Sequence, residues 1–283
     1  MLSLDLLIFV SLIYVAFLFG VAFWAERASD AGRGGWMRTP LIYTLSLSIY
    51  CTAWTFYGAV GFAARSGLEF LTIYLGPTVV LIGWWLILRR LVRIARAERI
   101  TSIADLLSSR FGKSALLGGL VTVMAVVGTT PYIALQLQSV TTSISVFAMG
   151  TQNILSSTNI ALWTAAGLAV FTIVFGTRNL DVNERHSGVV MAIAVEAIVK
   201  LLALLAVGVF VVWGLAGGAG DVLARIDASP ISQWEVSTGR WIGLTFLSAA
   251  AFLCLPRMFQ VMVVENSEES HLATASWAFP LYL

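Results

Sequence analysis

Long apolar runs dominate the chain and predict membrane-spanning helices. A run of about 18 or more apolar residues is long enough to cross the hydrocarbon core of a bilayer as a helix. No linker or low-complexity stretch separates the runs, so we expect one transmembrane domain over residues 1–283, all-α and polytopic. The predicted spans cover residues 5–25, 41–64, 70–92, 114–148, 160–177, 187–214 and 241–264, with an incomplete eighth at 271–283.

Composition excludes a water-soluble fold. The chain is 59% hydrophobic and 11% charged, with a mean hydropathy of +0.89, whereas a soluble domain carries roughly 25% charged residues. Its two cysteines, Cys51 and Cys254, both lie inside apolar runs, so we expect no disulfide. The opening "MLSLDLLIFV" has no basic region or small-residue cleavage site, which predicts a retained first span rather than a cleaved signal peptide.

The positive charges predict an orientation. Thirteen of the 17 lysines and arginines lie near the ends of spans one, three, five and seven or in the segments after them, and Lys200 lies inside a span. Only Arg65, Arg225 and Arg240 fall on the other side. Because cytoplasmic loops are enriched in lysine and arginine, the N-terminus is predicted to lie outside the cytoplasm.

A short amphipathic helix is predicted between spans three and four, at residues 101–112. Ser102 is a good N-cap, Asp105 falls in the first turn, and Gly112 can end the helix. Its apolar face suits a position on the cytoplasmic membrane surface, although an ordinary connector would have the same pattern.

The second span is unusually polar for a membrane helix. Hydroxyl residues recur at spacings of four, four and three, which places them on one helical face: Thr44, Ser48, Thr52 and Thr55. Gly58 and Gly61 weaken the same segment. Polar groups at membrane depth must face protein or a water-filled cavity. The stripe therefore indicates either helix–helix packing or a broken helix whose carbonyls and hydroxyls coordinate a cation.

Spans four and seven each carry a proline beside polar or aromatic side chains. In span four, Pro131 precedes Tyr132 and Gln136, which share a face. In span seven, Ser248, Phe252 and Pro256 follow one another at steps of four. Each proline leaves a carbonyl four residues back without its usual donor. These side chains are candidates for a solute pocket, and proline-kinked packing helices are the alternative.

Span six contains a charged pair, Glu196 and Lys200, in the favourable i, i+4 order. Both lie near mid-span, where an unpaired charge is costly. A neutralised structural pair and a coupling or proton-linked element are both compatible with this pattern. Because the sequence has no glycine-rich phosphate loop, no zinc-ligand spacing and only two histidines, we expect no enzymatic activity in this chain.

In their order along the chain, these segments resemble the sodium:solute symporter family, whose members include bacterial proline permeases. The opening of span two, "LSLSIYCTAWTFYGAVGF", is followed by "TSIADLLSSRFGKSALLGGLV" and "PYIALQLQS". Two further stretches are "FGTRNLDVNERHSGVVMAIAVEAIVKLLALLAVGVFV" and "FLCLPRMFQVMVVEN". These last two look most like the subgroup in which a symporter-like domain forms the N-terminal part of a sensor histidine kinase.

The resemblance implies an inverted-repeat fold: a first helix, then two repeats of five helices. Spans two to six would form the first repeat, and span seven would open the second. The family's sodium site joins the broken second span to the ninth, so we expect this sequence to be part of a longer protein. Two positions depart from the proline permeases, because Tyr50 stands near their acidic residue and Ser248 near one of their aromatic residues.

The resulting prediction is a sodium-coupled transporter-type domain in the bacterial inner membrane, with a periplasmic N-terminus. It would bind a small solute, an amino acid or a carboxylate, by alternating access. Its expected partners are the solute, the bilayer and fused downstream kinase domains, without nucleic acid or a cofactor other than Na⁺. The alternative is the sensory input domain of a membrane-bound histidine kinase in a two-component system. Predicted sodium ligands, as half of a site, are Ser48, Cys51 and Thr52, and predicted solute-binding residues are Trp54, Tyr132, Gln136, Ser248, Phe252 and Pro256.

Overall fold

Helices form all of the regular secondary structure in the residues that the computed structural model describes, 4–148, 157–171, 187–235 and 237–283. Three helices in this part of the chain are long and apolar enough to cross a membrane. A fourth candidate is a bent pair whose two halves meet at 60°. The three are α1 (Leu4–Asp30), α7 (Ala115–Ala148) and α9 (Ser187–Val209), which η5 (Phe210–Leu215) continues; the bent pair is α11 (Thr238–Cys254) with α12 (Pro256–Phe259) and η7 (Gln260–Val264).

The second and third predicted spans are each divided into shorter helices. The second breaks at Cys51 and Thr52, and the third ends near Gly83, about ten residues before its predicted end. The helix that follows carries an arginine-rich face, which favours water over lipid. The pieces are α2 (Pro40–Ser46), η2 (Leu47–Tyr50) and α3 (Ala53–Ser66) for the second span, then η3 (Gly67–Leu71), α4 (Thr72–Ile82) and α5 (Leu88–Glu98).

Helix α7 runs through Pro131 without interruption. Nearby hydroxyls return hydrogen bonds to the backbone: Thr129 Oγ1 donates to the Ala125 carbonyl at 2.8 Å, and Thr130 Oγ1 donates to the Val126 carbonyl at 2.7 Å. The remaining helices are α6 (Ile103–Arg110), α8 (Ser157–Phe171), α10 (Ala219–Asp227) and α13 (His271–Tyr282), with short η1 (Gly34–Arg38) and η6 (Pro230–Gln233).

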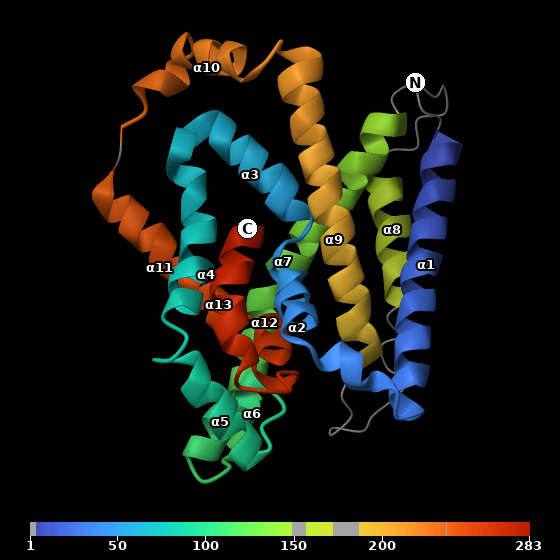
Figure 1. The fold of residues 1–283 in the computed structure, drawn as a ribbon, viewed down its shortest axis with the longest axis vertical. Coiled ribbons are helices and arrows are strands. Elements are labelled where there is room, and N and C mark those ends of the chain that lie inside the picture. Colours follow the sequence, from blue (N-terminus) through green and yellow to red (C-terminus); the bar gives the residue numbers. More distant parts are fainter. Residues whose placement is uncertain (1–3, 149–156, 172–186, 236) are drawn as a thin grey trace.

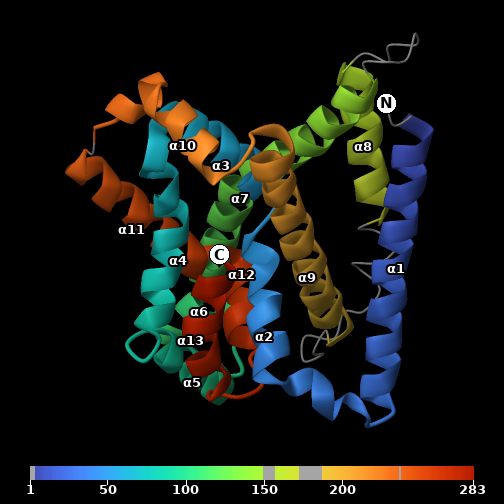
Figure 2. The same ribbon diagram turned by 45° about the horizontal axis from the view of Figure 1, so that its top comes forward.

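Figures 1 and 2 show α1 and α9 side by side, with α8 and the upper part of α7 beside α1. Helix α10 crosses one end of the molecule, and α5 and α6 occupy the opposite end. Two glycines permit close helix contacts. A Cβ on Gly188 would lie 2.6 Å from the Ala22 carbonyl oxygen of α1, and one on Gly76 of α4 would lie 2.0 Å from Ser248 Oγ of α11. These contacts bring the helices to backbone distance.

The main apolar core lies where α2, α4, α5, the bent pair and α13 meet. Its fully buried side chains include Leu47, Leu81, Leu88, Phe252 and Phe279. The C-terminal end of α13 therefore lies in the middle of the molecule (Figures 1 and 2). This core brings the first helix break and the bent pair into one layer.

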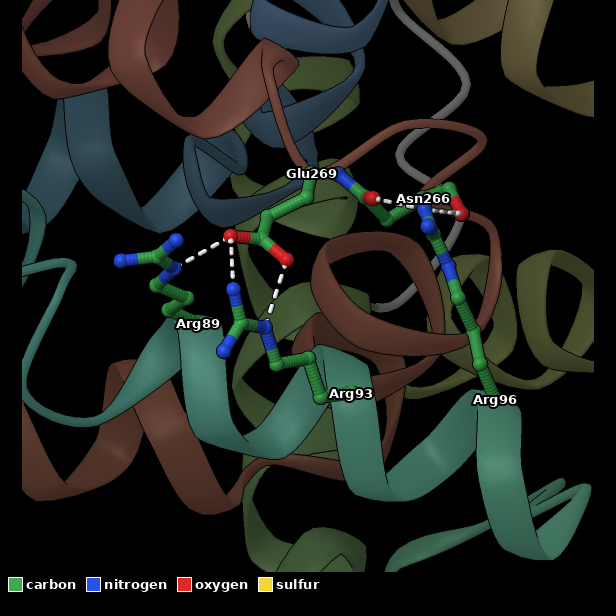
Figure 3. Close-up of polar contacts among 5 residues, drawn as sticks. All are labelled: Arg89, Arg93, Arg96, Asn266 and Glu269. Carbon is green, nitrogen blue, oxygen red and sulfur yellow. Dashed lines mark hydrogen bonds and ion pairs between the residues drawn. The ribbon is translucent and has the colours of Figure 1, made fainter.

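Arginines of α5 hold the loop that precedes α13. Figure 3 shows Arg89 and Arg93 converging on Glu269, while Arg96 reaches Asn266. Arg93 donates to Glu269 at 2.7 and 3.0 Å, and Arg96 donates to the side-chain oxygen of Asn266 at 2.7 Å. Hydrogen bonds from Arg93, assisted by Arg89, lower the pKa of the Glu269 carboxyl to about 2. We refer to these five residues as the arginine clamp.

Helix α6 lies at the same end, and Ser102 Oγ caps it by accepting from the Asp105 N–H at 3.1 Å.

Candidate functional site

The first helix break leaves a backbone carbonyl outside the helical hydrogen-bond pattern. Cys51 (φ −82°, ψ 103°) and Thr52 (φ −107°, ψ −178°) are both extended, so η2 ends before them and α3 starts after them. Thr55 Oγ1 accepts a hydrogen bond from the Thr52 N–H at 2.9 Å, which anchors the new helix start. Two members of the predicted hydroxyl stripe therefore form the break itself, and the Cys51 carbonyl oxygen is free to take another donor.

That donor is the ammonium group of Lys200 in α9. Lys200 Nζ donates to the Cys51 carbonyl oxygen at 2.8 Å and lies 3.3 Å from Glu196 Oε1. Both side chains of the charged pair are about one-third exposed. The lysine thus bridges the glutamate on its own helix and the break in the second span.

The second break lies at Leu255, between α11 and α12. Leu255 is extended (φ −62°, ψ 127°), and Pro256 after it has no N–H to continue the helix. The 60° bend turns Arg257 sideways from the line of α11. Its guanidinium lies over the Tyr132 ring of α7, 4.5 Å from the ring centre, within the range of a cation–π contact.

Tyr132 joins the two breaks. Its ring contacts Arg257 beside the second break, and its hydroxyl donates to Thr52 Oγ1 of the first break at 3.0 Å. The contacts form a continuous series, which we call the break network: Glu196, Lys200, Cys51, Thr52, Tyr132 and Arg257.

Two cavities flank the break network. The larger, of about 630 Å³, lies between α7, the start of α6 and the second break, and Tyr132, Gln136, Pro256 and Arg257 line it. We call it the α7 cavity. The other, of about 500 Å³, is lined mostly by apolar side chains together with Cys51, Thr52 and Lys200. Pockets of this size accommodate small solutes.

Three predicted site residues lie outside these cavities. Ser48 is fully buried in the packed interior. Ser248 donates to the Thr72 carbonyl oxygen at 2.7 Å and so belongs to the α4–α11 contact. Phe252 is buried in the core, edge-on to Tyr50 and stacked on Phe279. The side chain of Trp54 lies outside the described residues.

The predicted solute residues that the structure brings together are Tyr132, Gln136 and Pro256. Arg257 is the residue that sequence reasoning did not assign to the pocket. The signal was its position directly after a helix-breaking proline, because a bend there redirects the next side chain. Among the described residues, no group of three or more histidine, cysteine or acidic residues is arranged to hold a metal ion.

Comparison with known proteins gives a relative that is named as a symporter. The chain is 25% identical over 244 residues to the uncharacterized symporter YhjB of Bacillus subtilis (strain 168). The matched region is 83% of this chain and 46% of that protein, so the chain spans about half the length of this relative. No family model and no solved structure matches. Together with the apolar helices, this similarity supports a symporter-like membrane protein.

Proposed function

We propose that this chain is part of a symporter-type transporter that binds a small solute between its two broken helices. The observation that carries the proposal is the break network, in which α7 contacts both breaks through one side chain, Tyr132. Discontinuous helices in secondary transporters expose backbone groups to solute and coupling ions near the membrane midplane. The α7 cavity lies beside that network and is of suitable size.

In this proposal the shorter helices also cross or enter the membrane. The pieces α2 to α3 and α4, together with α8 and α13, supply the remaining predicted spans, and spans two to six form one inverted repeat. The end that carries the arginine-rich α5 faces the cytoplasm, as expected for clustered arginine. The α7 cavity includes residues at the start of α6 and therefore opens toward that side. Rocking of the repeats would then expose the same site to the opposite side.

The predicted binding site for the coupling ion lies at the first helix break. Sodium remains the ion that the family resemblance implies, with Ser48, Cys51 and Thr52 as half of its site. In the described conformation the Cys51 carbonyl oxygen accepts a hydrogen bond from Lys200. We therefore propose that sodium and the Lys200 ammonium compete for this carbonyl, and that sodium binds there only when the lysine withdraws.

A solute screen tests the proposal. Purified full-length protein in detergent would be heated with amino acids, short monocarboxylates, dicarboxylates, sugars and polyols at matched ionic strength. A solute that binds only the native state raises the Tm, and the rise grows with the logarithm of 1 + [solute]/Kd. We expect one class to raise the Tm of the wild-type protein and to act more weakly on Tyr132→Phe. If no member of the panel changes the Tm and none is taken up by proteoliposomes, the proposed function is wrong.

A further inference from the structure

Two residues that line the α7 cavity each carry a buried hydrogen-bond donor without an acceptor. Arg257 Nε and Gln136 Nε2 are inaccessible to solvent and have no partner among the described residues. One comes from α12 and the other from α7, and both residues line the same space. Buried donors are normally satisfied, and an orphaned one costs about 1–3 kcal/mol. Both side chains would therefore gain hydrogen bonds by turning these donors toward an acceptor that enters the cavity.

The charge of Arg257 is also uncompensated. Within the described part of the chain no carboxylate forms an ion pair with it. The nearby Glu265 carboxylate instead accepts a hydrogen bond from Gln260 at 3.1 Å. An unpaired guanidinium is expensive to bury unless it faces an anion or a water-filled cavity. Stacking on Tyr132 fixes the plane of the guanidinium without consuming any of its N–H donors.

We propose that the α7 cavity binds the carboxylate group of a small monocarboxylate, with Arg257 as its anionic anchor and Gln136 as a second donor. This assignment rests on the proposed function and specifies its solute class. A guanidinium recognises a carboxylate through paired N–H donors in one plane. The Gln136 amide, one helical turn from Tyr132 on α7, would turn to donate to the same group, and Tyr132 orients the arginine.

The rest of the cavity favours one carboxylate and an apolar remainder. Its described lining contains no aspartate or glutamate that would pair with the ammonium group of an amino acid. Arg257 is also its one positively charged residue, so a second carboxylate would lack a partner. Apolar side chains of the described lining supply the remaining surface, among them Val126, Ile133 and Leu255.

The experiment compares acids with their uncharged amides, which have nearly the same shape. Acetate, propionate, lactate and benzoate would each be titrated against the corresponding primary amide on the full-length protein, with the Tm shift as readout. We expect at least one acid to bind the wild type about tenfold or more tightly than its amide, as for a charge-assisted hydrogen bond. In Arg257→Gln this discrimination should fall to about twofold or less, and in Gln136→Leu it should fall partially.

Arg225→Gln is the matched control, because Arg225 is exposed and pairs with Asp221 on α10. It should keep the wild-type discrimination. Arg257→Lys retains the charge but not the paired donors, so an intermediate result there supports the proposal if Arg257→Gln unfolds. The proposal is overturned if a folded Arg257→Gln binds the acid as the wild type does. The proposal is also overturned if the solutes that bind are sugars, polyols or amino acids and Arg257→Gln does not weaken their binding. In that case the proposed transport function still stands.

Discussion

The Lys200 ammonium donates a hydrogen bond to the Cys51 carbonyl oxygen at 2.8 Å, across 149 residues of sequence. The Lys200 ammonium therefore already binds the Cys51 carbonyl oxygen, the atom predicted to coordinate sodium. The lysine is held by Glu196 at 3.3 Å and remains partly exposed, so it has room to withdraw. The break in the second span is therefore stabilised by a side chain that a bound ion would have to displace.

Replacing Lys200 tests this competition. Lys200→Met removes the ammonium and keeps an unbranched apolar chain, so sodium should gain access to the Cys51 carbonyl. We expect the apparent affinity for sodium, measured from the sodium-dependent Tm in choline-balanced buffer, to rise about tenfold, the size of a lost charged hydrogen bond. Arg225→Met, which removes an exposed positive charge on α10, is the control, with little change expected. An identical sodium response in Lys200→Met and wild type would show that the two cations do not compete.

The contact between Tyr132 and Thr52 predicts energetic coupling between α7 and the first break. Tyr132→Phe removes the hydroxyl that donates at 3.0 Å and keeps the ring that contacts Arg257. Thr52→Val removes the acceptor. We expect a coupling free energy of about 1 kcal/mol in a double-mutant cycle on the free energy of unfolding. Strictly additive single effects would mean that this hydrogen bond does not connect the two elements.

Gly76 is predicted to tolerate no side chain. In Gly76→Ala the new Cβ would lie 2.0 Å from Ser248 Oγ and 2.4 Å from the Ala249 backbone nitrogen, so α4 and α11 must separate. We expect destabilisation of about 1–3 kcal/mol. Gly119→Ala in α7 has nothing within 4 Å and should be neutral or stabilising by up to about 1 kcal/mol. Equal stability of the two variants would contradict the close α4–α11 contact.

The arginine clamp predicts a pH dependence with a definite sign. The Glu269 pKa is lowered from 4.5 to about 2, first by hydrogen bonds from Arg93 and then by Arg89. A lowered carboxyl pKa stabilises the native state above the unfolded pKa, and this contribution is lost as pH falls toward the folded value. The Tm difference between wild type and Glu269→Gln should therefore be constant near neutral pH and shrink below about pH 4.5. The exposed Glu98→Gln provides the control, and a difference that instead widens in acid would refute the sign.

Some of this architecture could be predicted from the sequence because its physical causes are local. Thr52 and Thr55 interrupt an apolar run with groups that lipid cannot solvate; Thr52 lies in the break, and Thr55 caps the helix that starts after it. Ser102 and Asp105 indicated the start of α6, since capping depends on neighbouring residues. The early end of the third span was missed because apolar residues continue past Gly83 while the arginine face of α5 takes over.

The roles of other residues depend on distant contacts. Ser248 was predicted to line the pocket. Because Gly76 has no side chain, α11 packs so close to α4 that the Ser248 hydroxyl donates to the backbone of α4 instead. Arg257 was not assigned to the pocket, because the size and direction of the 60° bend that turns it toward Tyr132 depend on packing as well as on the proline. Lys200 and Glu196 could be paired from their spacing, whereas the Cys51 carbonyl could be found only from the packing of α9 against the break.

The most direct test of the central claim is whether solute occupies the α7 cavity. Ile133 lines this cavity and is 56% exposed, so Ile133→Cys in a cysteine-free full-length protein should react readily with a maleimide. Leu162→Cys on α8, which is 67% exposed, reports general effects of the solute. With a stabilising solute from the panel at about ten times its Kd, we predict labelling about tenfold slower at position 133 and unchanged at position 162. Unchanged labelling at position 133 by a solute that raises the Tm would place the binding site elsewhere and contradict this account.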